Sequence, residues 1–186
     1  MLLDLLRKRR SIRRFTDQPV EDEKIDLLLE AALLSPSSKG NTPWHFVVVR
    51  DPGCIAKLAQ AKPHGAAFLK NAPLVIAVCG DSNQSDVWVE DCSIATLLLH
   101  LQATDLGLGS CWVQLRLRHH ESGGSGDNDA QSAAAYTAEL LGLPAHIQPL
   151  ALVGIGYPAE SKKARSKEDL LFSQVSSERL GQAWRS

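Results

Sequence analysis

Residues 86–106 form the segment that most constrains the fold. On a helix, their apolar side chains would occupy most of the circumference instead of one stripe; they are Ile94, Ala95, Leu97, Leu98, Leu99 and Leu101. A helix that is apolar on most sides is buried on most sides. We therefore expect it to be central in the fold or to face another subunit. Glu90 and Asp91, near its start, either approach a functional site or reach solvent.

Several shorter segments have residue patterns that are typical of strands or helices. Residues 44–49 (WHFVVV) are β-branched or aromatic, residues 73–79 (PLVIAVC) form a continuous apolar run, and residues 151–155 (ALVGI) give a third strand. Residues 110–117 are expected to be extended. Helices are expected at residues 2–6, 21–34, 54–62, 66–71 and 133–141. The length of 186 residues fits one domain over residues 1–186, with a flexible polar loop inserted at residues 119–131.

The overall charge and the cysteines argue against several classes of protein. The net charge is −1 and the pI is about 6.6, whereas a general nucleic-acid binder has a strongly basic face. The four cysteines are widely spaced and form no C-x-x-C pair, which favours reduced thiols over a disulfide framework or a zinc site. No apolar run reaches the roughly 18 residues of a membrane span, and the N-terminus lacks the pattern of a signal peptide. We therefore expect a cytoplasmic protein.

Four arginines stand within six residues near the N-terminus, in the sequence RRSIRRF (residues 9–15). Guanidinium groups are permanently charged and bind phosphate oxygens through two hydrogen bonds, so such a cluster is typical of an anion site. Ile12 and Phe15 interrupt the charges, which indicates a segment docked on the core. A second basic cluster, near the other end of the chain, comprises Lys162, Lys163, Arg165 and Lys167. The alternative is that both clusters are solvated surface.

The common nucleotide and hydrolase motifs are absent. Gly107 and Gly109 could begin a G-x-G-x-x-G sequence, but the third glycine is missing and the pair follows a helix, whereas a dinucleotide-binding loop follows a strand. Neither a P-loop nor a G-x-S-x-G nucleophile motif occurs. His119 and His120 are adjacent, but no Cys or carboxylate stands at helical spacing from them, so we expect no metal site.

Five sequence motifs, taken in order, resemble the FMN-dependent nitroreductase family, and in particular its small bacterial and archaeal members. They are RRSIRRF, EAALLSPSSKGNTPWHFVVV, APLVIAVCGD, LGLGSCW and ALVGIGYPAE, and they fall between residues 5 and 160. The resemblance implies an α+β, nitroreductase-like three-layer fold in which helices flank a central mixed, mainly antiparallel sheet. It also implies an intertwined homodimer with FMN bound in two clefts at the interface.

The resemblance also implies which residues bind the cofactor. Those expected to hold the FMN phosphate and the polar edge of the flavin are Arg9, Arg10, Ser11 and Arg13. Those expected to reach the flavin from the other subunit are Pro36, Ser37 and Ser38. Those expected to pass the isoalloxazine ring are Gly109, Ser110, Cys111 and Trp112. Lys163 and Arg165 are expected to close on the phosphate, and Arg14 is expected to be an ordinary surface charge.

The reaction implied by the resemblance is a ping-pong transfer of electrons from NAD(P)H through FMN to a nitroaromatic, a quinone or a similar small acceptor. No catalytic residue is certain, because the flavin N5 carries the chemistry. His64 is a candidate proton donor, and a surface histidine is the alternative. Two other hypotheses stay open: a flavin-binding relative with another reaction (dehalogenation, flavin fragmentation) or no catalytic role, and a structural domain without a cofactor.

Two departures from the family pattern bear on these expectations. Many members carry N-x-Q-P-W where this chain has Gly40-Asn41-Thr42-Pro43-Trp44, so both amide side chains are displaced or lost. The tail after Pro158 is also short, which predicts a reduced arm around the partner subunit.

Overall fold

One antiparallel sheet forms the middle layer of the fold. The computed structural model describes residues 1–120 and 131–184. The strand order is β1-β2-β4-β3, where β1 is Trp44–Val49, β2 is Leu74–Asp81, β3 is Gly109–Gln114 and β4 is Ile147–Gly156. The interior strands β2 and β4 are buried along nearly their whole length, as the apolar run at residues 73–79 predicted. The predicted flexible loop at residues 119–131 lies mostly outside the described residues.

Strand β4 begins earlier than the sequence predicted, at Ile147 instead of Ala151. The additional part contains Pro149, which has no N–H to donate to a neighbouring strand. The pairing of β2 with β4 shifts register between Val78 and Cys79, and Pro149 lies opposite Cys79 at this irregularity. A bulge is one of the few places where a strand accepts proline, so the bulge allows β4 to continue through it.

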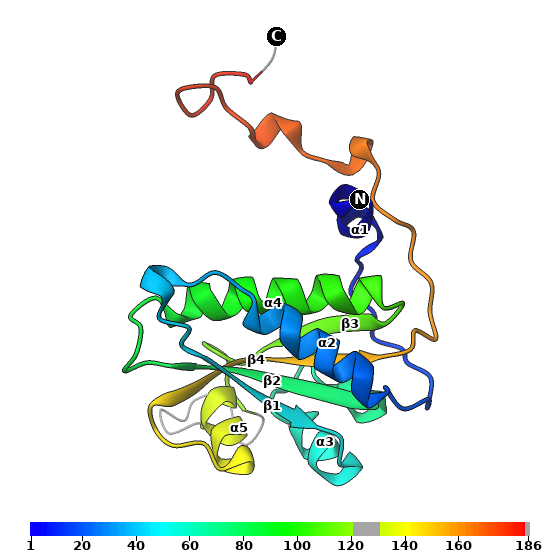
Figure 1. Cartoon of the computed structure of the whole chain (residues 1–186), viewed down its shortest axis with the longest axis vertical. Coiled ribbons are helices and arrows are strands. Elements are labelled where there is room, and N and C mark those ends of the chain that lie inside the picture. The colour runs from blue at the N-terminus through cyan, green and yellow to red at the C-terminus, as the bar shows by residue number, and fades with distance from the viewer. Residues whose placement is uncertain (121–130, 185–186) are drawn as a thin grey trace.

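Helices cover both faces of the sheet (Figure 1). Helices α2 (Asp22–Leu33) and α4 (Trp88–Asp105) lie on one face, and α3 (Pro52–Leu58), α5 (Ala133–Leu141) and the 3-10 helix η2 (Ala67–Asn71) lie on the other. Each face has its own cluster of buried apolar side chains. The fold is therefore an α+β, three-layer arrangement, as predicted. None of the helices in residues 1–120 and 131–184 has the length and apolarity that crossing a bilayer requires.

Capping residues determine where helices α3 and α5 begin. Helix α3 starts two residues before the predicted Cys54, because the Asp51 side chain accepts a 2.7 Å hydrogen bond from the Cys54 N–H and Pro52 occupies the first turn. Helix α5 has the predicted bounds. The Ser132 hydroxyl caps its start, and Gly142, with a φ of 65°, ends it in the left-handed conformation that glycine adopts readily.

Helix α4 is central, as its sequence predicted, but it is not covered on every side. Its fully buried residues include Cys92, Ala95, Thr96, Leu99 and Ala103. The opposite side leaves Ile94 and Leu97 exposed at 42% and 46% of their surface. A strip of apolar surface on α4 is therefore uncovered in the single chain.

The two ends of the chain run beside each other and away from the sheet (Figure 1). Helix α1 (Leu2–Lys8) lies next to the segment that follows β4, and the Arg165 N–H donates a 3.0 Å hydrogen bond to the Arg7 carbonyl oxygen. Beyond this contact the tail continues through two 3-10 turns, η3 (Lys167–Asp169) and η4 (Phe172–Gln174), and extends past α1. Both ends are thus brought to the same edge of the molecule.

A buried histidine connects α4 to β3. The His100 Nδ1 lies 2.7 Å from the Ser110 Oγ, and both residues are buried. Burial, with a smaller contribution from the nearby Arg9 charge, lowers the pKa of His100 from 6.5 to about 4. The imidazole is therefore neutral at pH 7, where it hydrogen-bonds the edge strand to the central helix.

The His100 pKa predicts a pH dependence of stability. Below pH 6.5 the unfolded chain takes up a proton on His100 that the folded chain takes up only near pH 4, so the free energy of unfolding falls as the pH drops through that window. For this group the fall amounts to about 3 kcal/mol. We expect His100→Gln, which cannot titrate, to lose that part of the dependence in urea unfolding measured from pH 7 to pH 4. Equal slopes in the wild type and in His100→Gln would refute the prediction.

Candidate functional site

The arginine segment of residues 9–15 is held against the ends of β3 and β4 by backbone hydrogen bonds and two apolar side chains. Ser11 pairs with Ser110 in an isolated parallel bridge, and the Ile12 N–H donates to the Ser110 carbonyl oxygen at 3.0 Å. Ile12 and Phe15 are each 8% exposed, so they anchor the segment as predicted. The arginines consequently project from a fixed backbone.

Gly109 allows this close approach. A Cβ atom at residue 109 would lie 2.7 Å from the Ile12 side chain, which is closer than carbon atoms can pack. The role of Gly109 that the structure shows is thus to admit Ile12 against the end of β3. Any larger residue would displace the arginine segment.

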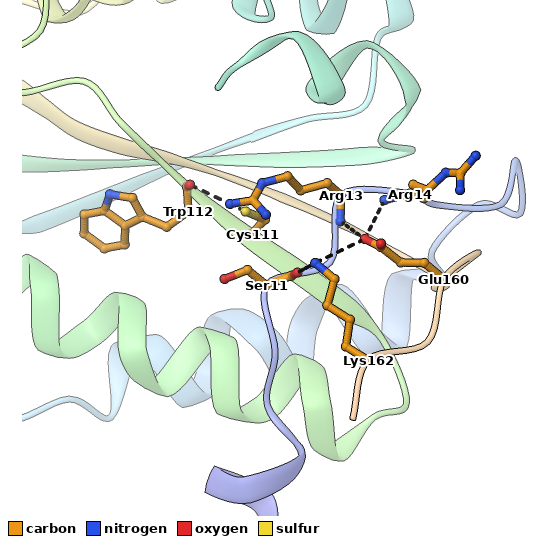
Figure 2. Close-up of polar contacts among 7 residues, drawn as sticks. All are labelled: Ser11, Arg13, Arg14, Cys111, Trp112, Glu160 and Lys162. Atoms are coloured by element: carbon orange, nitrogen blue, oxygen red, sulfur yellow. Dashed lines mark hydrogen bonds and ion pairs between the residues drawn. The ribbon is translucent and has the colours of Figure 1, made fainter. Parts of the chain in front are cut away.

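Glu160 organises the polar contacts of the segment (Figure 2). Its Oε1 accepts hydrogen bonds from the backbone N–H groups of Arg13, at 2.6 Å, and Arg14, at 3.2 Å. These bonds, the Arg13 bond first, lower the pKa of Glu160. Lys162 Nζ lies 3.7 Å from the same oxygen and donates a 2.5 Å hydrogen bond to the Ser11 carbonyl oxygen. Glu160 therefore fixes the segment through the backbone N–H groups of Arg13 and Arg14 and not through their guanidinium groups.

The two basic clusters, which stand near opposite ends of the sequence, meet at one edge of the molecule. The Arg10 guanidinium donates a hydrogen bond to the Lys163 carbonyl oxygen, and the Arg165 backbone is bonded to that of Arg7. In the described part of the chain no carboxylate lies within 4.0 Å of the charged groups of Arg9, Arg13, Lys163 and Arg165. Asp169, which lies nearby, accepts hydrogen bonds from Ser166. The edge of the molecule thus carries an excess of positive charge.

The β3 residues of the predicted site alternate between the two faces of the sheet. The Ser110 hydroxyl points to α4 and is bonded to His100, whereas the Cys111 side chain points toward Arg13 (Figure 2). Burial raises the pKa of the Cys111 thiol, and the neighbouring Arg13 charge opposes this effect only in part. Gly109, Ser110 and Cys111 are buried and Trp112 is half-buried, so Trp112 exposes the most side chain of the four.

The serine loop lies at the other end of α4. The Ser38 N–H donates a 2.9 Å hydrogen bond to Asp91 in the first turn of α4, whereas the arginine segment lies near His100. Nine residues separate Asp91 from His100, which corresponds to about 14 Å along a helix. Pro36, Ser37 and Ser38 are therefore not gathered with the arginines in a single chain (Figure 1).

Two histidines considered from the sequence, His64 as a candidate proton donor and His120 as part of a pair for which no metal site is expected, differ in their surroundings. His64 is exposed in the turn between α3 and η2. His120 is buried, stacks on Tyr136 with 3.9 Å between ring centroids, and has its Nδ1 3.3 Å from the Ala61 carbonyl oxygen. The His120 ring therefore packs as part of the core around α5.

Sequence reasoning missed two polar residues that shape the site, Glu160 and His100, and it left the roles of two others, Lys162 and Asp91, open. Lys162 belongs to the predicted basic cluster, but it was not among the two residues chosen from it. The other three act on backbone groups or on a buried hydroxyl, and only Asp91 carried a signal, as a carboxyl group on a largely apolar helix.

Comparisons with known proteins agree on one family. The nitroreductase family profile matches residues 6–62 and 56–157. A protein of Archaeoglobus fulgidus, provisionally named an NADH dehydrogenase/NAD(P)H nitroreductase, is 37% identical over 171 residues, covering 90% of this chain and 91% of the relative. An FMN-dependent nitroreductase of Clostridium difficile superposes with a TM-score of 0.89 and 42% identity, covering 96% of this chain and 99% of that one.

A provisionally assigned nitroreductase of Desulfovibrio desulfuricans, solved in complex with FMN, superposes with a TM-score of 0.74 and 29% identity. The superposition covers 96% of this chain and 97% of that one. The profile match spans both the arginine segment and β3 with β4, which are the elements that build the site described above. The chain therefore belongs to the nitroreductase family.

Proposed function

We propose that the protein is an NAD(P)H-dependent flavin oxidoreductase that binds FMN at the edge where its two basic clusters meet. The observation that carries this proposal is a group of basic side chains on a fixed backbone, Arg9, Arg13, Lys163 and Arg165, that have no carboxylate partner among the described residues and suit a dianionic phosphate. Membership of the nitroreductase family supports it, as do the relatives named for FMN and NAD(P)H.

In this proposal most of the basic residues bind the phosphate, and Arg13 acts on the flavin. Arg9 and Arg10 bind the phosphate, with Lys163 and Arg165 closing on it from the C-terminal segment. The Ser11 hydroxyl contributes a further hydrogen bond. Arg13 brings positive charge to the polar edge of the flavin, where it favours the negative charge that develops on reduction. Burial of Ile12 keeps these groups in register with β3.

FMN supplies the electron-transfer chemistry, and the chain supplies position and charge. The cycle is ping-pong: NAD(P)H gives up its electrons and leaves before a nitroaromatic, a quinone or a similar small acceptor takes them. Trp112 is half-buried and exposes more side chain than the other β3 residues of the proposed site, and we assign it to line the flavin ring.

We further propose that the active form is a homodimer. Ile94 and Leu97 on α4 are exposed, and a groove of about 560 Å³ between α1, α2 and α4 is lined by apolar side chains that include Leu34 and Leu98. The extended tail exposes others, including Phe172. A second copy would cover these surfaces and bring its serine loop to the arginine site, which the loop does not reach within one chain.

Purified protein tests the proposed activity directly. Bound FMN absorbs at about 450 nm, and NAD(P)H oxidation with nitroaromatic and quinone acceptors should give parallel double-reciprocal lines. Protein that stays colourless with added FMN would refute the cofactor. Protein that binds FMN but turns over none of these acceptors would point instead to a relative with another reaction.

The proposed FMN-binding role of Arg9 and Arg13 can be tested with the neighbouring Arg14 as a control. Changing Arg9 and Arg13 together to Ala should raise the Kd for FMN by about 100-fold or more, because each charged hydrogen bond contributes about 1.5–3 kcal/mol. Arg14→Ala is the control, since it removes a neighbouring positive charge that is expected to face solvent, and its Kd should stay within about threefold of wild type. Flavin fluorescence quenching measures all three proteins; similar effects of both changes would contradict the assignment.

The dimer has an independent test. The wild-type protein should have a mass of about 40 kDa in sedimentation at micromolar concentration, twice the 20.2 kDa of the chain. Leu97→Glu on the exposed strip of α4 should shift the protein toward monomer, because it buries a charge in the interface. Ala135→Glu on α5, which lies on the opposite face of the sheet, should leave the mass unchanged. A monomeric wild type would refute the dimer.

A further inference from the structure

Asp91 is a buried acid in the first turn of α4. It is 3% exposed, and burial of a carboxyl group is unfavourable unless hydrogen bonds satisfy its oxygens. Both oxygens are satisfied: Oδ1 accepts the Ser38 N–H at 2.9 Å, and Oδ2 accepts the Ser85 hydroxyl at 3.2 Å. Asp91 thus joins the start of α4 to a loop 53 residues earlier in the sequence.

The loop that Asp91 contacts, residues 35–43, has a backbone that needs outside support. Lys39 and Thr42 have φ angles of 54° and 48°, a region that residues other than glycine enter at an energetic cost. The Thr42 N–H donates to the Ser37 Oγ at 2.9 Å, and Asn41 and Gln84 exchange two side chain–backbone hydrogen bonds. The hydrogen bond from the Ser38 N–H to Asp91 connects this loop directly to helix α4.

We propose that Asp91 is a positioning residue that holds the 35–43 loop in the conformation with which it reaches FMN in the partner's site. This inference rests on the proposed function, in which Pro36, Ser37 and Ser38 serve the other subunit. An acid suits the task because its two oxygens can accept from two donors at once. Replacing it with an apolar residue leaves the Ser38 N–H and the Ser85 hydroxyl without their acceptor.

The two ends of α4 then serve different sites of the dimer. Its first turn holds the loop that is presented to the partner, and His100, near its other end, is bonded to Ser110 beside the chain's own arginine segment. A change at Asp91 should therefore affect FMN bound to the other subunit's arginines.

Three variants test the positioning role through FMN affinity. We expect Asp91→Ala to raise the Kd for FMN by about tenfold or more, because a buried hydrogen-bonding pair is broken. Asp91→Asn should stay within about threefold of wild type, since the amide can accept from Ser38 and donate to Ser85. Glu90→Ala, which removes the exposed neighbouring acid, is the control and should leave the Kd unchanged.

Mixing two defective chains tests whether Asp91 acts across the dimer. One chain carries Asp91→Ala, and the other carries Arg9→Ala with Arg13→Ala. Each heterodimer would then contain one site with intact arginines and an intact partner loop. Random mixing should restore tight FMN binding to about a quarter of the sites. If the loop acted on its own chain's arginines, mixing would restore none.

The outcomes separate this inference from the function on which it rests. A wild type that binds no FMN refutes the proposed function. If the wild type binds FMN and Asp91→Ala binds it equally well, only the positioning role is refuted. The same holds if Asp91→Asn loses affinity for FMN, or if mixing the two defective chains restores no binding sites. If Asp91→Ala does not fold by circular dichroism, Ser85→Ala removes one of the two supports and should weaken FMN binding by about threefold. An unchanged Kd in folded Ser85→Ala would then overturn the inference.

Discussion

The docking of residues 9–15 against β3 and the end of β4 is the contact on which the site depends. The Ile12 N–H bond to Ser110 and the Ala159 N–H bond to the Arg14 carbonyl oxygen place both ends of the chain on the same edge. Without this pairing the two basic clusters would be separate charged segments on the surface. The absence of a side chain at Gly109 gives Ile12 the space to pack there.

Helix α4 shows how one element serves core, site and surface together. One side of this helix packs toward the sheet, and the other side carries the exposed apolar strip that contains Ile94 and Leu97. Two of the polar residues on this helix, Asp91 and His100, are buried and hydrogen-bonded to other elements. They mark the positions where the core contributes to the geometry of the proposed site.

The sequence predicted the features that depend on local pattern, and it missed those that depend on contacts between distant residues. The apolar run of β2 and the central place of α4 follow from periodicity, and the ends of α5 follow from Ser132 and Gly142. The early start of β4 depends on a bulge opposite Pro149, which requires the register with β2. The sequence likewise does not tell which lysine of the second basic cluster contacts the arginine segment, because only the tertiary structure shows that the Lys162 side chain bonds to Ser11.

The excess of positive charge at the joined termini has a consequence for the protein without its cofactor. Like charges repel one another, so we expect the docked arrangement of both chain ends to be less stable without a bound anion than with one. A bound phosphate would relieve that repulsion and stabilise the folded state by mass action. FMN would then be a structural cross-link between the first and last segments of the chain as well as a redox group.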